Sequence, residues 1–500
     1  MQKSSINNNS AAGDNATLVP QMPLWLSVLP ITLLLGVLIR LIVTIGPDAI
    51  NQWSPFVLLG SAALAVALAL PTRRLTRGAM RRGIRISCTQ ILPAVPLLAL
   101  IALVSTTWML SGIVPTLIDY GLKYLNPTLF LSLTCICCAL VSLLTGSSWT
   151  TIATMGVAFM GIGTVLGYSE PWTAGAIISG AYFGDKVSPL SDTTVVASSS
   201  CGVDLFRHIR YMFVTTTPAL LAALTVFTIV GFTSGGSADH AGDPELLGAL
   251  HSTFNITPWV LVVPLITGIL IACRINTLLV LCVSAALGTA CIWIAQPQLA
   301  AGLNPVTVLL SDTTLSTGSA RLDELAATSG LMGMVPTICL VLCAMVFGAA
   351  MLGTGMLASI AGAFTRRLRR RTSIVGATAC SGLALNCCTA DQYLALIVGA
   401  NMYRDVYSKF GLEHRLLSRT LEDSVSVTSV LIPWNSCGVT QSAVLGVATL
   451  SYLPCCVFNY LSPVFTIIVA RLGWKIPAPV LPAIDTDASS LPAIDTEVNP

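Results

Sequence analysis

Long apolar stretches recur along most of this chain and are separated by short polar breaks. A helix that crosses a bilayer needs about 20 residues, so about 10–12 such segments fit into this length. The apolar stretches cover residues 24–45, 55–70, 91–114, 129–144, 152–166, 174–183, 211–232, 259–273, 278–294, 332–356, 374–385, 394–400, 425–450 and 452–470. The pattern predicts an all-α polytopic membrane protein.

Several of these stretches are too short to cross a bilayer of roughly 30 Å as regular helices. The polar run Thr145–Thr150 separates two of them in the first half, and Asn386, Thr389 and Asp391 interrupt the apolar pattern of the second half. Irregular backbone is tolerated at membrane depth only where protein or water covers it. We therefore expect a re-entrant hairpin with a polar tip in each half of the chain.

The pattern Asp-x-Val-Ser-x-x-Ser follows each expected hairpin. Its polar members are Asp185, Ser188 and Ser191 in the first copy and, 238 positions later, Asp423, Ser426 and Ser429. Ionisable residues are costly inside a membrane, so two related copies indicate function. The repeated order of hairpin and motif predicts two structurally related halves with broken helices. We expect these halves to be inverted repeats with the site at their interface.

Both motifs carry oxygen ligands of the kind that hard cations favour. Pro189 and Pro433 cannot donate a helical hydrogen bond, so we expect the backbone carbonyls of Asp185 and Ser429 to be free. The predicted cation ligands are Asp185, Ser188, Asp423 and Ser426. This interpretation requires neither a histidine nor a thiolate, and we expect no cofactor.

The wider ion- or substrate-binding set combines the hairpin tips, the motifs and the polar residues beside them. It consists of Thr145, Ser147, Ser148, Asp185, Ser188, Ser191, Asp192, Asn386, Thr389, Asp391, Glu422, Asp423, Ser426, Ser429 and Asn435. The alternative role of each hydroxyl is to bond a helix backbone. Adjacent helical residues point about 100° apart, so we expect only one of Glu422 and Asp423 to line the site.

Charged neighbours of the motifs have open roles. Lys186 either pairs with Asp185, extends toward the membrane surface, or carries protons. Asp192 either belongs to the site or faces water. Arg419 lies three residues before Glu422, which is the spacing of an ion pair on one helical face.

Composition supports the membrane interpretation. The chain is 54% hydrophobic and 9% charged, whereas about a quarter of residues are charged in soluble domains. Arginines crowd residues 73–85 and 366–371, and the positive-inside rule places both loops and the N-terminus in the cytoplasm. Nucleic-acid binding is the disfavoured alternative for these runs. The sixteen cysteines lie largely in apolar runs, where cysteine behaves as a small hydrophobe.

The chain divides into seven expected parts. These are a disordered polar N-terminal tail (1–22), N-terminal membrane helices with an arginine loop (23–88), a first transport repeat (89–232), a polar linker (233–257), intervening helices and a loop (258–328), a second transport repeat (329–471) and a disordered C-terminal tail (472–500). A tandem Leu-Pro-Ala-Ile-Asp-Thr sequence occurs in the last part, which is typical of a low-complexity segment.

These motifs resemble those of the NhaC family of sodium/proton antiporters, within the ion transporter superfamily. The most distinctive run is Gly180-Ala-Tyr-Phe-Gly-Asp-Lys-Val-Ser-Pro-Leu-Ser-Asp-Thr-Thr194, and residues 145–149, 386–393 and 421–435 also match. The similarity extends over residues 20–470. Val425 and Val430 stand where the family pattern has Gly and Pro, and Val195-Val196 is a further departure, which bears on ion preference. The resemblance implies a homodimer whose hairpin tips and broken helices bind ions between a scaffold and a mobile transport region.

The favoured function is sodium/proton exchange through paired interior carboxylates in the cell (inner) membrane. The resemblance also suggests the alternative of a sodium- or proton-coupled transporter of an organic acid such as malate, lactate or an amino acid. A carboxylate substrate attracts arginine as a counter-charge, and neither expected tip contains one. This absence favours simple exchange.

Other function classes fit less well. An ion channel does not need interior carboxylates and broken helices in both halves. The sequence has no Walker A motif, so ion gradients are the expected energy source, and we expect no enzymatic activity. The expected partners are sodium, protons and membrane lipid, with a small organic anion as the alternative, and no nucleic acid.

Overall fold

The computed structural model of the chain describes residues 22–474, except 46–48, 73–76, 93, 235–243, 274, 303, 314, 316, 318, 320–321, 324–325, 329 and 366–369. The two expected tails lie outside these residues, apart from their innermost positions. The centre of the expected polar linker and five of the loop arginines lie outside them as well.

The described elements are helices in both halves of the chain. The N-terminal part forms α1 (Leu24–Ile45), α2 (Ala49–Ala69), α3 (Arg77–Ile91), α4 (Ala94–Leu110) and α5 (Ile113–Tyr124). The first expected repeat continues with η1 (Pro127–Leu129), α6 (Phe130–Thr145), α7 (Ser148–Thr151), η2 (Ile152–Gly156), α8 (Val157–Val165), α9 (Glu170–Val187), α10 (Asp192–Cys201) and α11 (Leu205–Ser234).

The middle and the second expected repeat follow the same pattern. The middle contains α12 (Pro244–Thr253), η4 (Pro258–Leu261), α13 (Val262–Ala272), α14 (Thr277–Ala295), α15 (Pro297–Ala300), α16 (Pro305–Leu310) and α18 (Gly330–Gly333). The second repeat contains α19 (Val335–Gly353), α20 (Met356–Thr365), α21 (Arg371–Thr389), α22 (Gln392–Lys409), α23 (His414–Leu421), η5 (Glu422–Ser426), η6 (Ser429–Leu431), α24 (Ser436–Leu445), α25 (Thr449–Tyr452), η7 (Leu453–Cys455) and α26 (Val457–Leu472).

The expected all-α polytopic membrane fold is confirmed. Within the described residues, eight helices are long and apolar enough to cross a membrane, and the number rises to ten if two bent helix pairs each count as one span. This total is the lower end of the expected range. Helices α9, α21 and α22 are not among these candidates although they are 18 or 19 residues long, because the polar residues of the motifs and tips lower their hydropathy.

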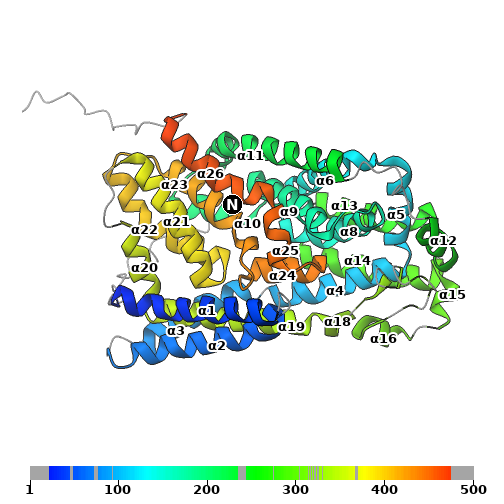
Figure 1. Cartoon of the computed structure of the whole chain (residues 1–500), viewed down its shortest axis with the longest axis horizontal. Helices are drawn as coiled ribbons and strands as arrows, with labels where there is room; N and C mark the ends of the chain where they lie inside the picture. Colours follow the sequence, from blue (N-terminus) through cyan, green and yellow to red (C-terminus); the bar gives the residue numbers. More distant parts are fainter. Residues whose placement is uncertain are drawn as a thin grey trace, which may run out of the picture.

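Helical hairpins occur at both expected places, at opposite ends of the bundle. The expectation that their arms are too short to cross a membrane is wrong for the first hairpin, because residues 127–145 and 148–165 are each long and apolar enough to span. That the hairpins are re-entrant stays a prediction. Figure 1 shows α6 and α8 toward one end and α21 and α22 toward the other, with α9, α24, α25 and α26 between them. Helices α1, α2, α3 and α19 pack together along one side. The arrangement brings both hairpin turns toward the middle of the molecule. The inverted relation of the two repeats stays a prediction.

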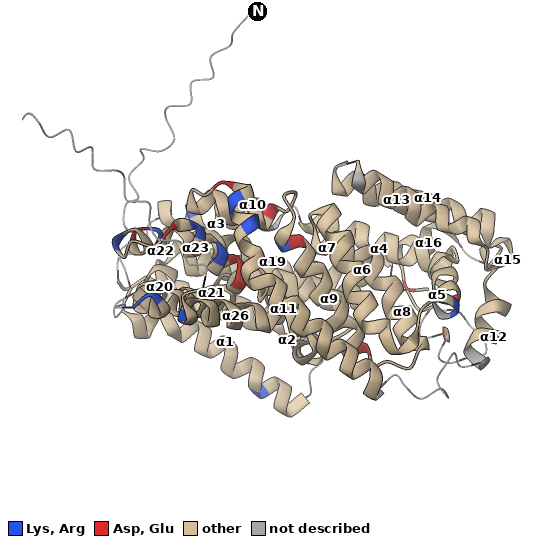
Figure 2. Ribbon diagram, turned by 90° about the horizontal axis from the view of Figure 1, so that it is seen from above, with Lys and Arg blue, Asp and Glu red and all other residues tan. Residues whose placement is uncertain are grey.

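The segment expected as an arginine loop is mostly helical. Its described arginines, Arg77, Arg81, Arg82 and Arg85, lie on α3 and are exposed. Helix α3 packs closely on α19, since a Cβ at Gly83 would lie 2.8 Å from the carbonyl oxygen of Ala349. Most of the described lysines and arginines gather at one end of the molecule, around α3, α10, α20, α22 and α23 (Figure 2).

Helix α9 is held in place by an unusually close contact with α6. A Cβ at Gly180 would overlap the carbonyl oxygen of Cys135, and a Cβ at Gly184 would overlap that of Ala139. Small residues at this i, i+4 spacing allow helix backbones in membranes to approach closely. The contact fixes the end of α9, which carries Asp185, against the first hairpin.

We expect Gly184→Ala to destabilise the protein, because the added methyl group meets backbone atoms of α6 that cannot turn aside. Overpacking of this kind typically costs about 1–3 kcal/mol. Gly60→Ala on α2 is the matched control, since no atom lies within 4 Å of its Cβ position. Thermal unfolding in detergent should show a lower melting temperature for Gly184→Ala alone. Equal melting temperatures would contradict the close-packing argument.

Candidate functional site

The first hairpin turns at a left-handed residue followed by a helix cap. Helix α6 ends at Thr145, Gly146 has φ 67°, and the Ser147 side chain caps α7 by accepting from the N–H of Thr150 at 3.2 Å. The Thr145 hydroxyl accepts from the Ser147 N–H at 3.1 Å and donates to the Ser147 carbonyl at 3.2 Å. The tip is thus closed by its own hydroxyls.

The second hairpin repeats this construction. Helix α21 ends at Thr389, Ala390 has φ 55°, and the Asp391 carboxylate caps α22 by accepting from the N–H of Leu394 at 2.9 Å. The Thr389 hydroxyl accepts from the Asp391 N–H at 3.3 Å and donates to the Asp391 carbonyl at 2.7 Å. Thr145 and Thr389 therefore hold equivalent positions, as do Ser147 and Asp391.

The first broken helix places Asp185 against the first hairpin tip. Helix α9 ends two residues after Asp185, and α10 begins after a break at residues 188–191. Ser148 donates both its N–H (3.2 Å) and its hydroxyl (2.7 Å) to Oδ2 of Asp185. Asp185 is 8% exposed. The carboxylate and the start of α7 therefore form one unit.

The other polar residues of the first motif have mainly structural contacts. Ser188 donates to the carbonyl of Leu143 at 2.8 Å, and Ser191 caps α10. Asp192 is exposed, in agreement with the interpretation that it faces water. Of the four predicted cation ligands, Asp185, Ser188 and Asp423 bond to different partners, and the Ser426 hydroxyl completes no hydrogen bond in the described part of the chain. Among the described residues, no group of three His, Cys, Asp or Glu side chains is arranged to hold a metal ion.

The second broken helix changes geometry at its motif. Helix α23 runs into a one-turn π-helix, η5, which contains Glu422, Asp423 and Ser426; such turns are frequent at functional sites. Asn386 donates from the second hairpin to the Val425 carbonyl at 2.7 Å.

Helix α24 begins after the break that follows η5. Asn435 caps α24 and donates to the Asn386 carbonyl at 3.3 Å. Ser429 donates to Gln392 at 3.2 Å, and Ser436 donates to Asp391 at 3.2 Å. These contacts attach the second break to the second hairpin tip.

A buried ion pair joins the two motifs. The Lys186 ammonium group, 1% exposed, donates to Oδ1 of Asp423, which is fully buried. Ser462 of α26 accepts a second hydrogen bond from Lys186 at 2.6 Å. Lys186 therefore pairs with the carboxylate of the opposite half and not with its neighbour Asp185, because the last turn of α9 directs adjacent side chains to different sides.

Asp423 is surrounded by further donors. Thr215 of α11 donates to its Oδ2 at 2.8 Å, Thr466 of α26 also donates to Oδ2, and Ser462 donates to Oδ1 at 2.9 Å. The Arg419 Nε lies 4.0 Å from Oδ2. The expected pairing of Arg419 with Glu422 is therefore wrong; Arg419 lies beside Asp423, at i, i+4 spacing, and over the ring of Tyr211.

Two fully buried ionic groups lack hydrogen-bond partners in the described part of the chain. They are the guanidinium of Arg419 and both carboxylate oxygens of Glu422. Glu422 is close enough to Lys186 and Asp185 for Coulomb interaction. We name the five residues Asp185, Lys186, Arg419, Glu422 and Asp423 the buried charged cluster.

The two prolines do not free the carbonyls as expected. The Asp185 carbonyl accepts from the Ser188 N–H at 3.1 Å, and the Ser429 carbonyl accepts from the Ile432 N–H at 3.3 Å. The chain tightens to i, i+3 bonds where the proline interrupts the helix, so both carbonyls keep a donor.

Sequence reasoning did not find Thr215, Ser462 and Thr466. The only signal was the spacing of Ser462 and Thr466, which places two hydroxyls on one face of an otherwise apolar helix. That signal is weak because such hydroxyls usually bond their own helix backbone.

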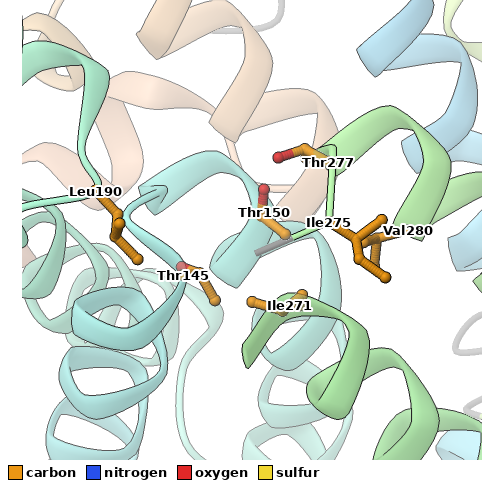
Figure 3. Close-up of a pocket in the computed structure, with 7 residues that line it drawn as sticks. All are labelled: Thr145, Thr150, Leu190, Ile271, Ile275, Thr277 and Val280. Atoms are coloured by element: carbon orange, nitrogen blue, oxygen red, sulfur yellow. The ribbon is translucent and has the colours of Figure 1, made fainter. Parts of the chain in front are cut away.

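A pocket of about 210 Å³ opens beside the first hairpin tip. Figure 3 shows Thr145 and Thr150 of the tip on one side and Thr277, Ile275 and Ile271 of the α13–α14 connection on the other. Leu190, in the break between α9 and α10, lines the pocket on the side of the tip (Figure 3). Two of the residues that line the pocket, Thr145 and Thr150, flank Ser147 and Ser148 in the sequence. Ser148 in turn donates a hydrogen bond to Asp185.

We expect Lys186→Met to destabilise the protein strongly, since it leaves Asp423 buried without its cation. Breaking one partner of a buried pair typically costs about 3–5 kcal/mol. The double variant Lys186→Met/Asp423→Asn removes both charges and should unfold at a higher temperature than Lys186→Met. Thermal unfolding of the variants measures this. Simple additivity of the two single effects would contradict a direct pair.

Comparison with known proteins gives a consistent result. The model of the Na+/H+ antiporter family matches residues 15–201 and 180–474. The chain is 37% identical to the Na(+)/H(+) antiporter NhaC of Alkalihalophilus pseudofirmus, over 79% of this chain and 84% of that protein. It is 34% identical to the Na(+)/H(+) antiporter NhaC of Bacillus subtilis, over 74% and 82%.

A relative that is named for different substrates is similar to nearly the same degree. The chain is 35% identical to the malate-2H(+)/Na(+)-lactate antiporter of Bacillus subtilis, over 73% of this chain and 77% of that protein. The match to the family model covers both hairpins, both motifs and the helices between them. The chain therefore belongs to the Na+/H+ antiporter family, as an NhaC-type member.

Proposed function

We propose that this protein exchanges sodium for protons through the buried charged cluster. The observation that carries the proposal is the charge balance of the cluster. Lys186 and Arg419 supply two positive charges, whereas three carboxylates supply three negative charges when all are ionised. One sodium ion or one proton neutralises the remaining charge, and uncompensated charge is costly in an apolar interior.

Sodium and protons compete for the excess negative charge, and this competition couples the movement of one ion to the movement of the other. A site that holds one excess negative charge favours binding of one cation, and it disfavours two cations for the same electrostatic reason. Sodium on one side of the membrane displaces the proton, and the proton displaces sodium on the other. The family membership of the chain and its NhaC relatives support this assignment.

The repeated hairpins supply alternating access in this proposal. Each hairpin tip contacts the broken helix of its own half, and the Lys186–Asp423 pair links the two halves. We propose that the halves are inverted repeats, which is the architecture that places a site at the midplane between two gates. The pocket beside Thr145 and Thr150 is the candidate opening on one side.

The orientation follows from the distribution of basic residues. The end that carries α3, α20, α22 and α23 holds most of the lysines and arginines that the structure describes (Figure 2). By the positive-inside rule we place this end, and with it the N-terminus, on the cytoplasmic side of the cell membrane.

Exchange of an organic acid is the second candidate function. The argument against it was the lack of an arginine in either tip, but the fold brings Arg419 into the buried charged cluster, where its N–H groups donate no hydrogen bond within the described part of the chain. A guanidinium matches a carboxylate with two parallel hydrogen bonds. The malate/lactate relative supports testing this candidate.

We expect purified wild-type protein in proteoliposomes to move protons when a sodium gradient is imposed, with no organic compound present. Asp185→Asn and Asp423→Asn should each abolish this movement, because either change cancels the excess negative charge. A pH-sensitive dye inside the vesicles measures it. Proton movement that occurs only with added malate or lactate would favour the second candidate function, and unaltered transport in both variants would refute the charge argument.

Ser148→Ala should weaken the apparent affinity for sodium while leaving the maximal rate less affected. The variant removes the hydroxyl that orients Asp185 but keeps the backbone N–H contact. A net hydrogen bond of about 0.5–1.5 kcal/mol corresponds to a roughly two- to tenfold increase in KM. Thr225→Ala is the control, since its exposed hydroxyl bonds only to its own helix at Leu221. The same transport assay at varied sodium concentration decides the question.

A further inference from the structure

Asp423 has no remaining capacity to bind a cation in this structure. A carboxylate accepts about four hydrogen bonds, and Asp423 accepts four, from Lys186, Ser462, Thr215 and Thr466. A sodium ion at Asp423 would have to displace the Lys186 ammonium group or break several of these bonds. The carboxylate predicted from the sequence as a cation ligand is therefore already occupied by the protein's own cation.

The neighbouring carboxylate is in the opposite state. Both oxygens of Glu422 are fully buried, and no donor in the described part of the chain meets them at full hydrogen-bond geometry. The buried Ser426 hydroxyl, one turn later, lies close to the carboxylate but completes no such bond. Thr193 of α10 approaches the same carboxylate. These groups supply only oxygen atoms, which is the ligand type that hard cations require.

We propose that Glu422, Ser426 and Thr193 form the sodium-binding site, and that Asp423 serves to hold Lys186. This assignment rests on the proposed function and specifies its ligands. Glu422 and Ser426 come from the second half and Thr193 from the first, so the ion binds across the interface of the halves. A hard cation would coordinate two carboxylate oxygens and a hydroxyl that complete no hydrogen bond within the described part of the protein.

The local backbone explains how adjacent acidic residues take different roles. Glu422 and Asp423 are consecutive in the π-helix η5, so their side chains diverge. Asp423 faces α11 and α26, which supply Thr215, Ser462 and Thr466. Glu422 faces α10, where Thr193 lies. The wider turn brings Ser426 to the same side as Glu422, four residues later.

The test is direct binding of radioactive sodium to the purified protein at alkaline pH, without any membrane gradient. Glu422→Gln should weaken binding by roughly 100-fold, because an ionic ligand is lost, and Ser426→Ala by roughly three- to tenfold, because a neutral ligand is lost. Glu170→Gln, at an exposed position on α9, is the matched control and should bind as the wild type does.

The outcomes separate this inference from the proposed function. If wild-type protein binds and exchanges sodium but Glu422→Gln binds it with unchanged affinity, the assignment of Glu422 is wrong and the exchange function stands. If wild-type protein binds no sodium, the exchange function itself fails. Thermal unfolding checks that Glu422→Gln is folded. If it is not, the Ser426→Ala result decides, and wild-type affinity in that variant overturns the site.

Discussion

The buried ion pair between Lys186 and Asp423 is the interaction on which the rest of the site depends. The two residues are 237 positions apart in the chain and belong to different broken helices. Neither charge is tolerated alone in an apolar interior, because the free energy of desolvating an isolated ion is a large fraction of the free energy of unfolding of a folded protein. The pair therefore fixes the two halves relative to each other, and Thr215, Ser462 and Thr466 complete its hydrogen bonds.

The hairpin tips explain how irregular backbone is kept at the centre of the bundle. Each tip reverses through one left-handed residue, and a threonine and a helix cap satisfy the polar groups that the reversal exposes. Left-handed backbone favours glycine, which the first tip has at Gly146. The second tip has Ala390, the one described non-glycine residue with positive φ. Its carbonyl accepts from the Ser436 N–H at 2.9 Å, a tertiary contact that helps hold the strained turn.

Much of this architecture could be predicted from the sequence because it is encoded locally. Apolar runs, prolines and clustered hydroxyls located both hairpins and both motifs, and the structure brings each tip to its own motif. The partner of Lys186 could not be predicted, because the sequence indicated only its neighbour Asp185, and the fold brings the distant Asp423 to it. The carbonyls of Asp185 and Ser429 were misjudged for a different reason. Proline removes one donor, but a tighter turn supplies another.

In the sodium site that we propose, Asp423 serves stability and its neighbour Glu422 serves transport. A carboxylate that already accepts four hydrogen bonds has no free oxygen lone pair for a transported cation. Asp423 can therefore hold Lys186 throughout the transport cycle. A carboxylate that is buried with open oxygens is costly until a cation or a proton arrives, so its occupancy responds to both concentrations. Placing the two side by side lets Asp423 hold Lys186 close enough to limit the free charge at Glu422. The excess is thereby kept at one unit, which is the amount that a single monovalent ion removes.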